Sequence, residues 1–175
     1  MNEIAMTPSQ QHETDFYRWT QDQAAQLRAL PRSFTRLDID NLAEEIEDMG
    51  RSEIREISSL LRQTLAHLIK IAFDGSAPSV AHWVEEASGF QGDAVLAVSP
   101  GLRQRLDLTK IWVVARRNAA DALAEHGVQV PALPDECPLT LDQLLDAGFS
   151  PRKAAAAMTE SAEGRGLDES RNGRR

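Results

Sequence analysis

Apolar residues recur at helical spacing over residues 38–73, a longer run than anywhere else in the chain. At about 100° per residue they stay within one stripe. Its members are Ile39, Leu42, Ala43, Ile46, Met49, Ile54, Ile57, Leu61, Thr64, Leu65 and Leu68. The phase does not change at Gly50, which favours one helix that can kink there over two helices that meet there. A chain organised around so long a helix is predicted to be all-α.

The remaining pattern predicts an irregular bundle of about four main helices. Thr14 is expected to cap the first helix, which ends at Pro31. Another runs from Ser79 to about Val98, although Gly89 and Gly92 weaken its centre. A further helix starts at Pro100 and ends at Gly127, and because it is apolar on two sides we expect it to be central.

Three prolines make residues 127–139 an irregular loop. After it, Thr140 and Gln143 form a capping box that opens a short helix. We expect residues 1–12 to be loose, residues 13–151 to form a single helical domain, and residues 152–175 to form a surface helix followed by a disordered basic tail.

The formal net charge of −8 is concentrated near the start, since residues 1–50 alone carry −6. An acidic body makes nucleic-acid binding unlikely but leaves room for a basic protein partner. The single cysteine suits a reducing compartment. Neither a signal peptide nor a membrane span is evident, so we expect a cytoplasmic protein without membrane contact.

Three blocks of sequence together resemble a known family. They are ETDFYRWTQDQAAQLR, LDIDNLAEEIEDMGRSEIREISSLLRQTLAHLIK and LPDECPLTLDQLLDAGFSP. In this order and spacing they are similar to the bacterial family called domain of unknown function twenty-nine, over roughly residues 13–151. Residues 75–100 depart from the family's Trp- and Arg-rich pattern. The resemblance implies an all-helical fold and a bacterial source, and it implies no activity or catalytic residue.

Four carboxylates crowd one segment of the long helix, at Glu44, Glu45, Glu47 and Asp48. On a helical wheel the apolar stripe lies near 0° and Glu45 near about 240°. The other three fall at about 80–180°, toward solvent, and Arg51 can pair with Glu47 and Asp48. Glu45 therefore faces a different neighbour from the rest. A metal site built from Glu44, Glu45, Asp48 and His67 is the less favoured interpretation, because no Glu-x-x-His motif is present.

Three other residues are candidates for a structural or partner-binding role. Arg116 falls on an apolar stripe, so burial would require an acid, and Glu45 is our first expectation; the alternative is that Arg116 extends to the rim. Cys137 follows two acids, which favours a buried apolar thiol over a nucleophile. Tyr17 lies off its helix's apolar stripe and could be a surface contact.

The sequence carries no nucleotide, serine-hydrolase or zinc-protease motif, so it predicts no cofactor and leans against an enzyme. We expect a non-enzymatic interaction or regulatory protein, for example an antitoxin-like inhibitor with a protein partner. The alternatives are a metal-assisted hydrolase or nuclease that uses the Glu44–Asp48 carboxylates, and weak nucleic-acid binding through the basic tail. Oligomeric state is not predicted.

Overall fold

The chain is all-helical, as predicted. The computed structural model describes residues 6–31, 36–75 and 78–172, with side chains described up to residue 162. These residues form eight helices and no strand. They pack as two compact units: unit 1 holds Met1–Ile57 and Val98–Leu106, and unit 2 holds Ser58–Ala97 and Asp107–Arg175. None of the described helices is long and apolar enough to cross a membrane.

The helix that the apolar stripe predicts is a single element, α3, Ile39–Phe73. It contributes its first part to unit 1 and the rest to unit 2. Gly50 does not end it. A Cβ at Gly50 would lie 2.3 Å from Oγ1 of the buried Thr20, so this glycine lets the neighbouring helix approach the α3 backbone closely. The stripe is not buried throughout, because Leu42 and Met49 are exposed.

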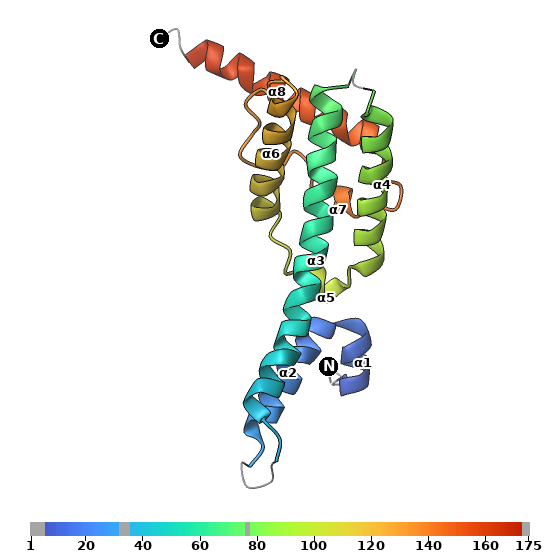
Figure 1. Cartoon of the computed structure of the whole chain (residues 1–175), viewed down its shortest axis with the longest axis vertical. Helices are drawn as coiled ribbons and strands as arrows, with labels where there is room; N and C mark the ends of the chain where they lie inside the picture. Colours follow the sequence, from blue (N-terminus) through green and yellow to red (C-terminus); the bar gives the residue numbers. More distant parts are fainter. Residues whose placement is uncertain (1–5, 32–35, 76–77, 173–175) are drawn as a thin grey trace, which may run out of the picture. The chain divides into compact units, whose positions relative to one another are not determined.

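Unit 1 adds three helices to α3 (Figure 1): α1, Pro8–Thr14; α2, Phe16–Ala29; and α5, Pro100–Arg103. The expectation of a loose start is wrong for Pro8–His12, because Thr7 opens α1 with a capping box that includes Gln10. Thr14 is the last residue of α1, and the cap of α2 is Asp15, whose carboxylate accepts from the Arg18 amide.

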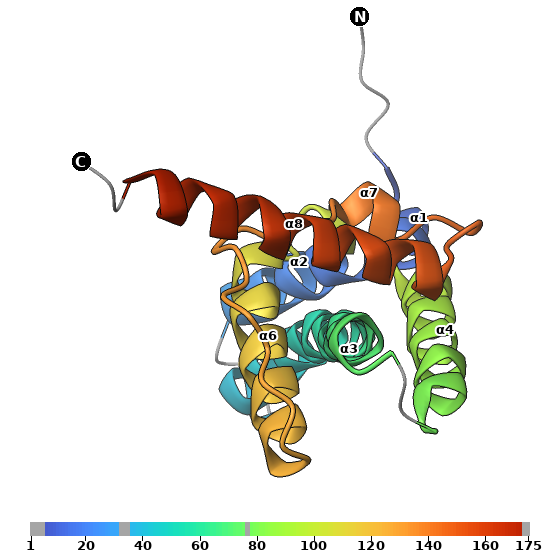
Figure 2. The ribbon, with the colours of Figure 1, turned by 90° about the horizontal axis from the view of Figure 1, so that it is seen from above.

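In unit 2, α4, Val80–Ala97, and α6, Leu108–Glu125, lie on opposite sides of α3, and α8, Pro151–Asn172, crosses beside them (Figures 1 and 2). The expected single helix from Pro100 to Gly127 is instead two helices, because the chain turns after α5 and Asp107 caps α6 anew. Gly127, with φ of 76°, follows the end of α6 in the left-handed region that glycine favours.

Helix α8 differs from its expectation. It is a fifth long helix rather than a surface appendage, because it buries Ala154, Ala155 and Met158. Ala155 packs with Ile71 and Val80. The helix also continues to Asn172, through most of the segment expected to be disordered. Residues 173–175 lie outside the described part.

The capping box at Thr140 and Gln143 is present and opens α7, Leu141–Leu144, as predicted. The turn after α7 is fixed by Gln91 of α4. This buried amide donates to the carbonyl oxygens of Leu144 and Asp146, at 3.0 and 2.9 Å. A side chain from another helix thus satisfies carbonyls that the short helix leaves unpaired.

Candidate functional site

The acidic segment of α3 is divided by its arginine partners. Glu47 pairs with Arg28 of α2 and with Arg51, and Asp48 accepts from Arg51 at 2.8 Å. The hydrogen bond from Arg28 is the main reason why the pKa of Glu47 is lowered, and the one from Arg51 lowers the pKa of Asp48. Glu47 is half-buried and joins two helices, so it is a structural ion-pair member rather than a freely solvated acid.

Glu45 lies outside this network. It is exposed, and no ion pair is found for it among the described residues. Its neighbours on the same side of α3 are Leu42 and Met49, whose exposed fractions are 42% and 53%. Around the helix axis these three residues fall within about 60° of one another, since each position advances about 100°. We call Leu42, Glu45 and Met49 the α3 face.

Tyr17 is not an open surface aromatic. The Arg105 guanidinium lies over its ring, 4.4 Å from the centroid, and donates to the Gly101 carbonyl at 2.5 Å. Arg105 also approaches the carboxylate of Asp15 at 3.7 Å. The ring is half-buried beneath a cation that fastens α5 to the start of α2, which gives Tyr17 a structural role.

The predicted metal ligands do not form a cluster. Nδ1 of His67 donates to the Gln63 carbonyl at 2.8 Å, and its Nε2 lies 2.8 Å from a carboxylate oxygen of Glu86. His82 approaches the same Glu86 oxygen at 3.3 Å. Asp48 is taken by Arg51, and Glu44 and Glu45 are exposed. Within the described ranges, no three His, Cys, Asp or Glu side chains could hold a metal ion.

Arg116 is half-buried and takes its acid from the proline-rich loop. Its Nη1 donates to the Pro134 carbonyl at 2.9 Å and to Asp135 at 3.0 Å. Trp112, one turn earlier on α6, donates from Nε1 to the same carbonyl at 2.9 Å. The predicted partner, Glu45, belongs to unit 1, so that pair stays a prediction, whereas Asp135 is the acid that the structure places at Arg116.

Cys137 follows in the same loop. Burial raises the pKa of its thiol to about 11, against a smaller lowering by a backbone hydrogen bond at Leu139. The thiol is therefore protonated at neutral pH, and a protonated thiol is a poor nucleophile.

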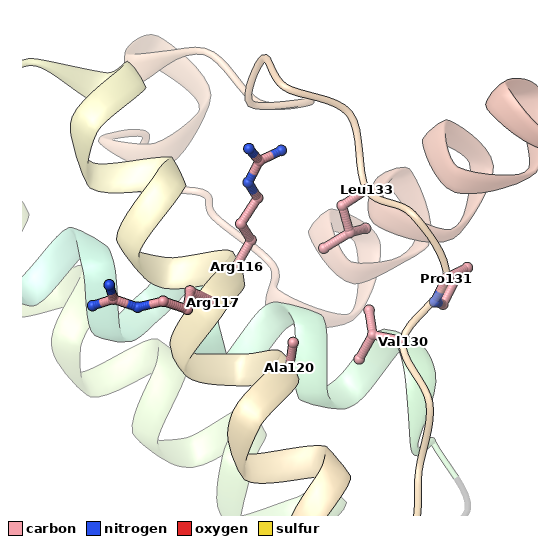
Figure 3. A pocket seen from close by; sticks show the side chains of 6 residues that line it. All are labelled: Arg116, Arg117, Ala120, Val130, Pro131 and Leu133. Atoms are coloured by element: carbon pink, nitrogen blue, oxygen red, sulfur yellow. The ribbon is translucent and has the colours of Figure 1, made fainter.

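A pocket of about 280 Å³ opens between α6 and the loop. Its lining residues are Arg116, Arg117, Ala120, Val130, Pro131 and Leu133. Figure 3 shows Arg116 on the side where the loop crosses the helix, and Arg117 leaving the opposite side. The pocket lining thus combines two arginines with an apolar wall, an arrangement able to bind an anion, and it includes no nucleophile and no acid.

Sequence reasoning missed the carbonyl of Pro134, which joins Trp112 to Arg116. The spacing of those two residues, four apart on one helix, was a usable signal, because such residues reach the same neighbour. Nothing in the sequence identifies the acceptor as a backbone atom of a loop.

The family resemblance is confirmed. The profile of domain of unknown function DUF29 matches residues 11–150, so the chain belongs to this family. It is also similar to an alpha-helical protein of unknown function from Rhodospirillum rubrum, whose crystal structure is known at 1.45 Å resolution. The two are 38% identical, with a TM-score of 0.76, over 83% of this chain and 95% of the other. No match is found among curated proteins.

Proposed function

We propose that this protein is a non-enzymatic interaction protein whose partner docks on the α3 face. The observation that supports this proposal is the exposure of Leu42 and Met49 on one side of a long helix, with the exposed Glu45 between them. Large apolar side chains exposed at positions i and i+7 on one side of a helix fit the spacing of helix-to-helix protein contacts.

The partner that fits is a basic amphipathic helix. Leu42 and Met49 are seven residues, or about 10 Å, apart along α3. A second helix can meet this spacing with apolar residues two turns apart. Glu45 and the exposed Glu56, which lies near the same side, call for Lys or Arg on that helix. The net charge of the chain, −8, would steer such a partner toward it.

A designed peptide tests this proposal. The probe is a fluorescent helix of about 18 Leu and Lys residues with Leu on one face, and its control carries Glu in place of Lys. We expect binding by anisotropy for the Lys peptide alone. The double variant Leu42→Ser with Met49→Ser should weaken it at least about tenfold. Leu96→Ser is the matched control, because Leu96 is 87% exposed on α4 in the other unit.

The charge is tested separately. Glu45→Lys should weaken binding by about three- to tenfold at low salt and less at high salt. Glu44→Lys changes the net charge equally but points about 100° away around α3, so it should have a smaller effect. If all these variants bind the Lys peptide like the parent protein, attraction is general rather than local and the proposed face is wrong.

An antitoxin-like inhibitor is one specific form of this role. In that case the basic helix would belong to an enzyme or toxin that loses activity when bound, and the α3-face variants would restore its activity. The cytoplasm remains the proposed location, where a lone thiol such as Cys137 stays reduced. The metal-assisted hydrolase is not proposed, because Asp48 and His67 already have other partners.

A further inference from the structure

We propose that the pocket between α6 and the proline-rich loop binds a small organic monocarboxylate with a short apolar tail. This site is separate from the α3 face and does not depend on it. The argument rests on the unused donors of Arg116, on the apolar wall beside them and on the way in which the loop is held.

Arg116 has hydrogen-bonding capacity to spare. A guanidinium has five N–H donors, and among the described residues Arg116 uses only Nη1, which donates to the Pro134 carbonyl and to Asp135. Its Nε and Nη2 have no partner among the described residues. This free edge is the one that a carboxylate can occupy with two parallel hydrogen bonds. Asp135 does not occupy the position proposed for the ligand carboxylate, because it contacts Nη1 of Arg116. The Asp135 side chain is also 76% exposed.

The rest of the lining suits a short hydrocarbon tail. Ala120 supplies a small side chain from α6, and Val130, Pro131 and the buried Leu133 supply the opposite wall (Figure 3). A volume of about 280 Å³ is at the small end of ligand pockets. It accommodates a tail of roughly four to six carbons.

The pocket is formed before any ligand arrives. Trp112, which is fully buried, and Arg116 donate to one carbonyl, that of Pro134, and thereby hold the loop against α6. Pro131 and Pro134 restrict the backbone on either side of Leu133. A preformed wall costs little ordering entropy upon binding, which favours even a small ligand.

The proposal is tested by amide NMR titration of the full chain with hexanoate, with hexanol for the tail alone and acetate for the carboxylate alone. We expect hexanoate to bind at least about tenfold more tightly than either, with amide shifts at residues 116–120, 130, 132 and 133. Equal binding of hexanol would overturn the anion site, and equal binding of acetate would overturn the apolar one.

Three variants localise the site. Ala120→Phe fills the pocket and should reduce hexanoate affinity at least about tenfold. Lys110→Gln is the matched control, because this exposed cation of α6 does not line the pocket, and it should change the affinity less than about threefold. Arg116→Lys keeps a charge and a donor for the loop but loses the planar edge, so the preference for hexanoate over hexanol should fall. If Ala120→Phe perturbs folding, contacts between the hexanoate methyl and Val130 in the parent protein decide; their absence at saturation would refute the proposal.

Discussion

Unit 1 and unit 2 use their apolar residues differently. Among the described residues, unit 1 buries six hydrophobic side chains, and unit 2 buries more than three times as many although it is less than twice as long. The six are Ala24, Ile39, Ala43, Ile57, Leu102 and Leu106. Unit 1 nevertheless exposes Met6, Leu30, Leu37, Leu42 and Met49, against Leu96 and Val113 in unit 2.

This contrast suggests different roles for the two units: unit 2 supplies the main hydrophobic interior, and unit 1 supplies an exposed apolar surface. Most hydrophobic residues of unit 2 are buried in an interior that includes Trp112. The small pocket lies beside this interior, between α6 and the loop. Unit 1 relies more on ion pairs and close backbone contact, such as Glu47 with Arg28 and Gly50 with Thr20. Exposed apolar side chains in unit 1 provide a surface on which a partner protein can bind.

The largest effect is expected in the interior of unit 2. Trp112→Ala should lower the free energy of unfolding by about 3–5 kcal/mol, because it leaves a cavity and removes a donor from the Pro134 carbonyl. Urea denaturation measures this loss. Leu42→Ala, on the exposed side of unit 1, is the control and should stay within about 0.5 kcal/mol. Similar losses for the two would mean that Leu42 is not free on the surface.

Glycine substitutions should act in opposite directions in the two units. Gly50→Ala places a Cβ against Thr20, whose hydroxyl already donates to the Tyr17 carbonyl, and should cost about 1–3 kcal/mol. Gly89→Ala meets nothing within 4 Å and should stabilise α4 by up to about 1 kcal/mol. Thermal unfolding of both variants compares them directly, and a stabilising Gly50→Ala would contradict the close approach of α2 and α3.

The smallest effect concerns the dependence of unit 1 on ion pairs. Because the hydrogen bond from Arg28 and the charge of Arg51 lower the pKa of Glu47 below its ordinary value, the ionised form stabilises the fold. That contribution is full above the unfolded-state pKa and is lost as the pH falls through the lower folded-state pKa. Glu47→Gln should therefore reduce stability at pH 7 and make it less sensitive to acid. Glu44→Gln should do neither, and an unchanged acid profile for Glu47→Gln would show that the pairs contribute nothing.

The sequence predicted the structure best where a periodic or fixed residue spacing corresponds to a regular helix. The length of α3 followed from its stripe, and the cap at Thr140 followed from its spacing to Gln143. Thr7 and Gln10 show the same cap signature before α1, but the polar composition of that helix concealed it, since periodicity requires apolar residues.

The candidate sites were less accessible from sequence. The need of Arg116 for a partner could be derived from its position on an apolar stripe, but Asp135 and the Pro134 carbonyl come from irregular backbone. Helical spacing says nothing about where a loop returns. Likewise, the helical wheel assigned Leu42 and Met49 to a buried stripe, whereas both are exposed. A wheel gives the direction of a side chain around the helix axis, but it does not show whether another helix covers that side.

The rate at which the protected thiol of Cys137 is alkylated can measure how often unit 2 opens locally. As the chain's one cysteine, half-buried and with a pKa of about 11, it reacts slowly with alkylating reagents while the loop stays closed. Each transient opening exposes it at an ordinary thiol pKa. The rate of alkylation then reports how often the loop leaves α6, without any added label.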